Sequence, residues 1–434
     1  MSVKVGICGL GTVGGGTVDV LRRNASVLTT RIGTEIEIVQ IGARRDNPSC
    51  NTGDIPVTRD VFAVADNPDV DIVVELIGGS DTARELVLRA IANGKHVVTA
   101  NKALIAEHGN EIFAAARDQG VVVAFEAAVA GGIPIITSLR DGLAANRIEW
   151  VAGIINGTGN FILTEMRDKG REFSDVLAEA QALGYAEADP TFDVEGIDAA
   201  HKLVILAALA FGMPLRFDAV YTEGIGEIQP EDVSYAEELG YRIKHLGIAR
   251  YRDNGVELRV HPTLVPEQCL IAQVSGVMNA VMVKGDAVGP TLYYGAGAGA
   301  EPTASAVVAD IIDIARGCTA TGTDLSPLGL SLDALVDPGV LPIADTVSAH
   351  YLRVSAVDKP GVLSQLAQIM STRGISIEAI IQKEPREGED RATVILLTNE
   401  TVESNLRAAI VEIEALDAVA DSVVHIRKDS LNGQ

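Results

Sequence analysis

The chain has 434 residues, of which 47% are hydrophobic and 22% charged, so it has the composition of a soluble globular protein and room for about two to four domains. Its formal net charge of −24 argues against a nucleic-acid partner, because phosphate binding needs clustered Lys and Arg. No apolar run reaches the roughly 18–20 residues of a membrane span, the N-terminal residues lack a signal-peptide pattern, and the four cysteines form no C-x-x-C pair. We therefore expect a cytoplasmic protein with reduced thiols and no membrane partner.

The first third of the chain alternates short apolar runs with helical segments. Near-continuous apolar strands separated by helices are typical of a parallel sheet covered on both faces. We therefore predict an α/β domain with a doubly wound parallel sheet over residues 1–135. Its predicted strands and helices, in chain order, are Val3–Cys8, Thr12–Leu28, Ile36–Ala43, Asp71–Ile77, Thr82–Asn93, His96–Ala100, Leu104–Gln119 and Val121–Phe125.

From residue 136 the pattern changes to that of an α+β domain, predicted over residues 136–302. Residues 291–300 are rich in glycine and are predicted as a loop. Pro302 then opens a helix over residues 303–316, which we expect to complete the first domain. The other predicted elements are a strand at Arg147–Ile155, helices at Phe173–Leu183 and from about Gly196 to Phe211, and further strands within residues 217–283.

Residues 317–348 are rich in Gly, Pro, Asp, Ser and Thr and are predicted as a linker. Residues 349–430 alternate strand-like and helix-like segments in the order βαββαβ, and we predict a small independent module there. Its segments are Tyr351–Ala356, Val362–Arg373, Ser376–Gln382, Arg391–Thr398, Val402–Ala415 and Val419–Ile426.

A glycine turn, Gly9-Leu10-Gly11-Thr12-Val13-Gly14, follows the first predicted strand and precedes a helix. In such a turn the first glycine allows the tight bend, the second lets a pyrophosphate approach the backbone, and the third lets helix and strand pack closely. The helix N-terminus adds amide donors and the positive end of its dipole. The motif alone is weak, but strand, turn, helix and second strand together predict a dinucleotide site and hence an NAD(P)-dependent oxidoreductase.

The end of the second predicted strand indicates which dinucleotide binds. An Asp or Glu at this point would accept a hydrogen bond from the ribose 2′-hydroxyl of NAD. Here Ile41-Gly42-Ala43 runs into Arg44 and Arg45, and a guanidinium pairs well with a 2′-phosphate. We therefore predict that NADP is preferred, with NAD as a second cofactor. The alternative is that both arginines are only solvated surface residues.

Charged residues gather at the start of the long predicted helix. Residues 203–211 are apolar on all sides, so this helix is expected to be buried. Asp198 and Lys202 are four residues apart and share one face, with Glu187 and Asp193 upstream. A surface pair is the alternative, but charges on a buried helix must be paired or serve a function. A lysine can protonate the alkoxide formed when hydride reaches a carbonyl, and carboxylates can orient that lysine or bind a substrate ammonium.

A second lysine, Lys102, follows directly on the predicted strand His96–Ala100. The carboxyl ends of the strands form the ligand-binding edge of a doubly wound sheet. Lys102 is therefore a candidate for the same site, although a lysine at a helix start is also common on protein surfaces. His201 lies next to Lys202 but about 100° round the helix, and we expect it to be a packing neighbour.

Together these segments resemble the homoserine dehydrogenases over about residues 3–320. The similar segments, in order, are Gly9–Gly14, Val98–Lys102, Asn156–Asn160, Leu183–Glu187 with Asp189-Pro190, and Gly196–Lys202. The tail resembles an ACT domain, in which Val354–Lys359 leading into Pro360-Gly361-Val362-Leu363 is similar to the first strand-to-helix turn. The layout is similar to that of the monofunctional enzymes: a Rossmann-type domain, an α+β substrate and dimerisation domain, and a regulatory ACT domain.

The resemblance implies reduction of L-aspartate 4-semialdehyde to L-homoserine with NAD(P)H, on the route to threonine and methionine. It implies that Lys202 is the proton donor and that Lys102 is its partner near the carbonyl and the nicotinamide. The residues that it implies for holding the amino acid are Glu187, Asp198, Asp193, Tyr185 and Thr158, and the further cofactor contacts are Gly184 and Gly299.

The resemblance also implies a monovalent cation, sodium or potassium, held by Glu126 and the carbonyl groups of Val129, Gly131 and Ile133. The ACT-like tail implies an amino-acid effector, with threonine the first candidate, and assembly into a homodimer or homotetramer. The chain departs from the family after Ile77-Gly78-Gly79, where Ser80-Asp81-Thr82 stands in place of Thr-Glu-Pro. This departure leaves the nicotinamide and substrate contacts of that loop open.

Two other functions fit part of the pattern. An ACT-tailed dehydrogenase of 2-hydroxy acids would use His with a carboxylate and Arg, and the sequence has no such set near the glycine turn. A ligand-sensing protein without activity could use the same scaffold, but Lys102, Glu187, Asp198 and Lys202 are all present. The tail could serve assembly rather than feedback, and that alternative stays open.

Overall fold

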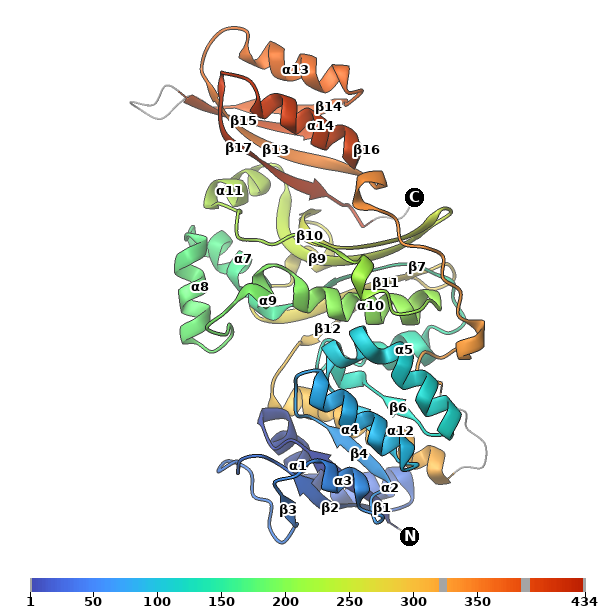
Figure 1. Ribbon diagram of the computed structural model, residues 1–434. Coiled ribbons are helices and arrows are strands. Elements are labelled where there is room, and N and C mark those ends of the chain that lie inside the picture. Colours follow the sequence, from blue (N-terminus) through green and yellow to red (C-terminus); the bar gives the residue numbers. More distant parts are fainter. Residues whose placement is uncertain (1, 320–325, 384–390, 432–434) are drawn as a thin grey trace. The chain divides into compact units, whose positions relative to one another are not determined.

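Two units make up the part of the chain that the computed structural model describes, which is residues 2–319, 326–383 and 391–431 (Figure 1). The first unit comprises Met1–Gly157, Asp198–Val220 and Val277–Pro338, and the second comprises Thr158–Ile197, Tyr221–Gly276 and Gly339–Gln434. Among the described residues, no helix is both long and apolar enough to span a bilayer.

The first unit contains a six-stranded parallel sheet in the order β3-β2-β1-β4-β5-β6. The inner strands are almost wholly buried, as expected of a parallel sheet covered on both faces. The strand order reverses at β1, because β2 pairs with one side of β1 and β4 with the other. Such a switch point is where doubly wound sheets bind ligands. The strands are β1 (Val3–Cys8), β2 (Ile36–Gly42), β3 (Val57–Thr58), β4 (Ile72–Glu75), β5 (His96–Thr99) and β6 (Val123–Ala124).

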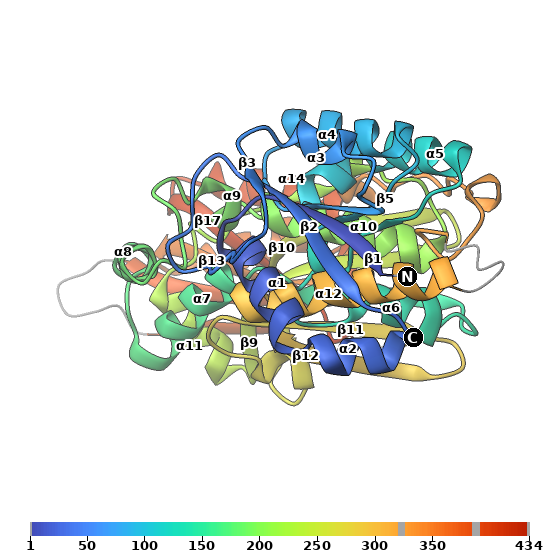
Figure 2. The same ribbon diagram turned by 90° about the horizontal axis from the view of Figure 1, so that it is seen from below.

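Helices cover both faces of this sheet, which confirms the predicted doubly wound fold (Figure 2). One face carries α3 (Phe62–Asp66), α4 (Asp81–Ala92) and α5 (Lys102–Gln119). The other carries α1 (Thr12–Arg23), α2 (Ala25–Ile32) and α12 (Ala300–Thr319), and apolar side chains of these three helices form one core with β1 and β2. The late segment α12 therefore completes a core that the first residues of the chain begin.

The predicted single helix over 12–28 is wrong. Asn24 ends α1 and begins α2, with φ −104° and ψ 10°, and α2 continues to Ile32. Asparagine is a weak helix former because its side chain competes for backbone hydrogen bonds, so a break at this residue is physically reasonable.

The first unit also holds a short antiparallel sheet in the order β12-β11-β7, from β7 (Ile148–Ile154), β11 (Met278–Gly285) and β12 (Gly289–Ala296). The predicted glycine-rich loop over 291–300 is therefore wrong, because most of it pairs with β11 as strand β12. The helix after it begins at Ala300, so Pro302 lies in its first turn, where a missing N–H costs nothing. The long helix α10 (Ile197–Phe211) is buried at every residue from 198 to 209, as its apolar sequence predicts.

The second unit is built on a sheet in the order β9-β10-β17-β13-β15-β14. Its first two strands form a hairpin, and β17 then pairs with β10 in parallel through Thr263 and Leu264. The strands are β9 (Tyr241–Arg252), β10 (Gly255–Pro266), β13 (Val347–Val357), β14 (Ile377–Gln382), β15 (Arg391–Thr398) and β17 (Val419–Lys428), with short strands β8 (Tyr221–Thr222) and β16 (Thr401–Val402). The helices are α7 (Gly157–Lys169), α8 (Phe173–Ala182), α9 (Thr191–Val194), α11 (Pro230–Glu238), α13 (Val362–Thr372) and α14 (Glu403–Glu414).

The C-terminal βαββαβ module has the predicted elements, and its sheet packs against other segments of the second unit. Tyr351, Ile395 and Ile426 from its sheet pack in one core with Ile162 of α7 and Val233 of α11. A separate core lies between the same sheet and the helices α13 and α14. The sheet of the module thus has a hydrophobic core on each face, one shared with α7 and α11 and one formed with α13 and α14.

The predicted linker over 317–348 contains the end of α12, two short 3₁₀ helices (Leu332–Ala334 and Ile343–Asp345) and the first residues of β13. The N–H of Val336 donates to the carbonyl of Gly212 at 3.1 Å. Residues 320–325 lie outside the described residues.

Candidate active site

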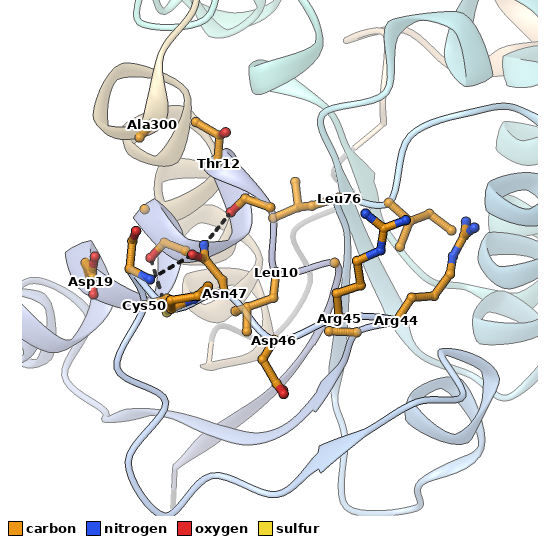
Figure 3. Close-up of a pocket in the computed structure, with 18 of the residues that line it drawn as sticks. Leu10, Thr12, Asp19, Arg44, Arg45, Asp46, Asn47, Cys50, Leu76 and Ala300 are labelled. Atoms are coloured by element: carbon orange, nitrogen blue, oxygen red, sulfur yellow. Dashed lines mark hydrogen bonds between the residues drawn. The ribbon is translucent and has the colours of Figure 1, made fainter.

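The glycine turn joins β1 to α1 and lines a cavity of about 890 Å³ (Figure 3). Gly9 has φ +107°, and a Cβ atom on it would lie 2.4 Å from the carbonyl oxygen of Leu76. A Cβ atom on Gly14 would lie 2.1 Å from the carbonyl oxygen of Gly9. At Gly11, no heavy atom outside the residue and its two chain neighbours lies within 4 Å of the same position. Only the second glycine thus faces open space, which is the arrangement that lets a pyrophosphate reach the backbone.

The far part of this cavity is formed by the loop after β2. Arg44 and Arg45 are exposed and line the cavity (Figure 3). Asn47 anchors the loop, because its side-chain oxygen accepts from the N–H of Ser49 at 3.0 Å and its amide group reaches the carbonyl of Gly11 at 3.5 Å. The loop therefore holds two guanidinium groups beside the glycine turn.

The predicted cofactor contacts fall into three groups. Those that line the cavity are Gly9, Leu10, Gly11, Thr12, Arg44 and Arg45. Val13 and Gly14 lie behind them in α1, and Gly299 directly precedes the lining residue Ala300. Lys102 stands at the start of α5, and Gly184 belongs to the second unit.

The two predicted lysines meet at one carboxylate. The Nζ of Lys202, on α10, donates to Oδ2 of Asp198 at 2.7 Å and to the carbonyl of Ile155 at 2.7 Å. The Nζ of Lys102 lies 3.2 Å from Oδ1 of Asp198. Asn156 adds a hydrogen bond from its amide to Oδ2 at 2.9 Å. Each oxygen of a buried carboxylate therefore faces one ammonium group.

The electrostatics of this cluster keep Asp198 ionised. Burial alone would raise its pKa, but the charges of Lys202 and Lys102 and the hydrogen bonds from Lys202 and Asn156 outweigh burial and lower the pKa to about 2. The side chain of Lys202 is 11% exposed and that of Lys102 is 35% exposed. The cluster thus offers one buried and one accessible ammonium group, which is suited to charge stabilisation and proton transfer at a polar substrate atom.

Local structure explains how Lys102 reaches this position. It is the first residue of α5, directly after β5 and Asn101. The side chain of Asn101 caps the helix by accepting from the N–H of Leu104 at 3.1 Å and donates to the carbonyl of Gly79 at 2.6 Å. The cap therefore fixes both the helix start and the loop that follows β4.

Sequence reasoning missed Glu75, the last residue of β4. It is fully buried, and it accepts from the hydroxyl of Thr99 at 2.6 Å and from the N–H of Ile77 at 2.9 Å. Burial raises the pKa of Glu75, against these hydrogen bonds. Because Ile77 lines the cavity, Glu75 organises the loop in which the chain departs from the family pattern. The available signal was an acidic residue at the carboxyl end of an apolar strand.

The residues predicted to hold the amino acid, other than Asp198, belong to the second unit. The hydroxyl of Thr158, on α7, donates to the carbonyl of Tyr185 at 2.7 Å. Tyr185 and Glu187 are exposed, and Asp193 on α9 is half-buried. The ring of Tyr185 packs edge-on against Phe161, with ring centroids 5.2 Å apart. The segment that carries Glu187 is therefore fixed to α7.

The residues predicted to bind a cation include one buried acid, Glu126. Glu126 is 2% exposed, and its carboxylate accepts from the N–H of Ile136 at 2.9 Å and from the N–H and hydroxyl of Thr137 at 2.8 and 2.6 Å. The backbone turns sharply at Ala130 and Gly131, which have φ +55° and +46°. Burial raises the pKa of Glu126, against the hydrogen bonds of Thr137 and Ile136. The segment that carries the carbonyls of Val129, Gly131 and Ile133 is thus tightly folded beside a carboxyl group that is costly to ionise alone.

Comparison with known proteins accounts for all three regions of the chain. Models described as homoserine dehydrogenase and as its NAD-binding domain match residues 134–312 and 9–126, and an ACT domain matches residues 350–415. The homoserine dehydrogenase of Pseudomonas aeruginosa is 65% identical over 431 residues, which is 99% of each chain. The crystal structure of a homoserine dehydrogenase from Thiobacillus denitrificans has a TM-score of 0.94 at 60% identity and covers 99% of each chain.

A more distant structure, a hyperthermophilic archaeal homoserine dehydrogenase in complex with NADPH, is 28% identical with a TM-score of 0.62 and covers 72% of this chain and 98% of its own. Identity over nearly the whole length extends from the glycine turn to the C-terminal module. The chain therefore belongs to the homoserine dehydrogenases, NAD(P)-dependent oxidoreductases with a nucleotide-binding domain, a catalytic domain and here a C-terminal ACT domain.

Proposed function

We propose that the chain reduces L-aspartate 4-semialdehyde to L-homoserine, with Lys202 as proton donor and Lys102 as its partner. The supporting observation is the buried Asp198 carboxylate with Lys202 at 2.7 Å on one oxygen and Lys102 at 3.2 Å on the other. A bound nicotinamide cofactor supplies the hydride. Lys202 then donates a proton from Nζ to the developing alkoxide, and both ammonium groups stabilise its negative charge.

The different roles of Lys202 and Lys102 follow from the exposure and geometry of their side chains. Lys202 is the more buried lysine. Its Nζ is fixed by hydrogen bonds to Asp198 and to the carbonyl of Ile155, so the N–H bonds of its ammonium group keep one orientation. Lys102 stands at the carboxyl edge of the parallel sheet, next to where the nicotinamide of a bound dinucleotide is expected. We assign Asp198 the role of orienting both lysines.

For substrate recognition we assign Glu187 and Asp193 to the ammonium group of the amino acid, together with Asp198. Thr158 and Tyr185 support them, because the bond between the Thr158 hydroxyl and the Tyr185 carbonyl anchors the segment before Glu187. Exposed Glu187 leaves its carboxylate accessible to a ligand.

For the cofactor we propose NADP, with NAD as a second choice. The two exposed guanidinium groups of Arg44 and Arg45 on the cavity wall support this choice, as does the NADPH bound to the archaeal enzyme. The remaining proposed contacts of the cofactor are Val13, Gly14, Lys102, Gly184 and Gly299.

We propose a sodium or potassium ion at Glu126 and the carbonyls of Val129, Gly131 and Ile133. The oxygen-only donor set fits a hard cation. A second acid, Asp310, accepts from the N–H of Glu126 at 2.8 Å, and burial and the charge of Glu126 raise the pKa of Asp310. A cation held by Glu126 would offset the unfavourable charge of this buried pair.

The ACT module is proposed to mediate feedback inhibition by threonine. The enzyme is proposed to act in threonine and methionine biosynthesis, in the cytoplasm, as a homodimer or homotetramer. Contacts within the second unit that link the module to the segment just before α10 support the proposed feedback inhibition. Arg427 of β17 donates to Glu223 at 2.9 Å, and the Glu223 carbonyl lies 3.0 Å from Nε2 of His245. A Cβ atom on Gly196, two residues before Asp198, would lie 3.2 Å from that ring. Initial rates of the intact chain with and without threonine test this proposal, and unchanged rates contradict it.

The catalytic proposal is tested by the oxidation of NADPH with aspartate semialdehyde as substrate. Lys202→Ala is expected to lower kcat by about 10²–10⁴-fold, the usual contribution of a general acid. Lys95→Ala is the matched control, because Lys95 is a 5% exposed lysine of the same unit that donates to the carbonyls of Asn67 and Val70. Undiminished turnover by Lys202→Ala would contradict the mechanism, and absence of turnover by the wild type would favour a ligand-sensing protein.

A further inference from the structure

A second contact joins α5 and α10, through a residue five positions after Lys102 on α5 and the residue just before Lys202 on α10. His201, next to Lys202, is 2% exposed, and its Nε2 lies 3.1 Å from Oε1 of Glu107 on α5. The imidazole stacks on Phe217, with ring centroids 4.1 Å apart and an angle of 14° between the planes. Burial lowers the pKa of His201, against the hydrogen bond to Glu107. An ionised carboxylate only accepts, so a hydrogen bond between these two groups has Nε2–H as its donor.

A third contact lies a further turn along α5. The side-chain amide of Asn110 donates to the carbonyl of Leu215 at 3.0 Å, and its oxygen accepts from the N–H of Leu215 at 3.1 Å. Gly109 permits this approach, because a Cβ atom there would lie 2.5 Å from Cδ1 of Leu215. Two hydrogen bonds therefore hold the chain just after α10 against α5.

We propose that Glu107, His201 and Asn110 are positioning residues that set the register of α5 against α10, and thereby hold Lys102 and Lys202 on opposite oxygens of Asp198. The inference rests on the catalytic role proposed for the two lysines. Lys102 and Glu107 share one helix, and Asp198 and Lys202 share the other with His201.

The geometry explains why register matters. A helix rises about 1.5 Å per residue, so a slip of α5 by one residue would displace Lys102 by about that distance relative to Asp198. Misplacement of a reacting group by about 1 Å can cost about 10²-fold in rate. Contacts between α5 and α4, such as the ion pair of Arg84 and Glu111 at 2.7 Å, hold α5 in the first unit but do not reach α10.

Glu107→Ala and His201→Phe test the proposal, because the first removes the carboxylate and the second keeps a ring for stacking on Phe217. Both are expected to lower kcat about tenfold and to change the KM for NADPH far less than Lys102→Ala does, since no residue of α5 lines the cavity at the glycine turn. Glu107→Gln keeps an acceptor for Nε2–H and is expected to retain kcat within about twofold. Glu111→Ala is the matched control on the same helix and is expected to leave kcat unchanged.

A purely structural role is separated from positioning by combining variants. If Glu107 acts through Lys102, Glu107→Ala lowers kcat by less than twofold in a Lys102→Ala background, because coupled residues are not additive. A tenfold loss in that background overturns the proposal, as does wild-type kcat in Glu107→Ala or an equal loss in Glu111→Ala. Full activity of Lys202→Ala and Lys102→Ala would instead overturn the proposed catalytic function, whatever Glu107→Ala does.

Discussion

Gly14 approaches Gly9 so closely that a Cβ atom on Gly14 would come within 2.1 Å of the Gly9 carbonyl oxygen. The contact joins the start of α1 to the end of β1, so it belongs to the folded protein itself. A Cβ atom on Gly11, between them, would meet no heavy atom within 4 Å beyond its chain neighbours, and Gly11 has φ −73° as the residue before α1. Two glycines of one motif therefore serve different purposes, one for packing and one for the ligand.

Alanine substitutions separate these purposes. Gly14→Ala is expected to lower the free energy of unfolding by about 1–3 kcal/mol, as overpacked sites do. Gly11→Ala is expected to leave thermal stability unchanged and to raise the KM for NADPH at least tenfold, because its methyl group enters the space for the pyrophosphate. Thermal melting and steady-state kinetics measure both effects, and equal melting temperatures for the two variants would contradict this reading.

Arg44 and Arg45 are expected to set the cofactor preference. Replacing both by Ala removes charge-assisted hydrogen bonds to the 2′-phosphate, each worth about 1.5–3 kcal/mol, so kcat/KM for NADPH should fall by about 10–100-fold or more. The value for NADH should change little. Arg31→Ala on α2 is the charge control, because Arg31 is exposed and lies outside the cavity lining. A parallel loss with both cofactors would count against 2′-phosphate recognition.

The second unit is expected to lose stability in mild acid because it buries neutral histidines. Burial lowers the pKa of His245 to about 4 and that of His350 to about 3, and it also lowers the pKa of His261 and His425. Below the unfolded pKa of about 6.5, only the unfolded chain takes up these protons. Each histidine then reduces the free energy of unfolding by about 1.4 kcal/mol per pH unit until its folded pKa is reached.

Hydrogen exchange at pH 7 and pH 5 measures this effect strand by strand. Protection of β10, β13 and β17 should fall towards pH 5 after correction for intrinsic exchange rates. A variant of His350 is the control. The Nδ1 of His350 lies 3.0 Å from Nε2 of His425, and the side chain is near Glu403 and Arg427. His350→Gln should reduce the pH dependence by one histidine's share, and equal protection at both pH values would refute the linkage.

The cation proposal predicts a specific salt effect on stability. A ligand that binds only the folded state stabilises it in proportion to the logarithm of its concentration. The melting temperature should therefore rise with sodium or potassium chloride but not with choline chloride at equal ionic strength. Glu126→Gln should abolish the difference between the salts. If choline is as effective as sodium in the wild type, the effect is ionic screening and the site is wrong.

The sequence predicts local features of the fold well and distant pairings poorly. The strand–turn–helix around Gly9 and the buried helix α10 follow from patterns within a dozen residues, and both are present. The glycine content of residues 291–300 indicates a loop, but antiparallel pairing with β11 makes most of it a strand. The pairing of β10 with β17 joins segments far apart in the chain, and no local pattern reports it.

The candidate site shows the same division. The local sequence around Lys102 and around Asp198 predicts each residue separately, and the distance of 3.2 Å between Nζ of Lys102 and Oδ1 of Asp198 follows from the fold. The sequence predicts that His201 only packs, and it does stack on Phe217, but its hydrogen bond to Glu107 depends on how two helices far apart in the sequence meet. Glu75 was missed because a single acid at a strand end carries no periodic signal.

The core shared by α7, α11 and the C-terminal sheet has a consequence for synthesis on the ribosome. Once residues up to 338 have emerged, the nascent chain holds every segment of the first unit, including α12. At that moment Ile162 of α7 and Val233 of α11 still lack Tyr351, Ile395 and Ile426, the side chains that cover them in the finished protein. The growing polypeptide therefore holds these apolar side chains without their final partners until translation reaches β17, and exposed apolar surface of this kind favours aggregation of newly made chains.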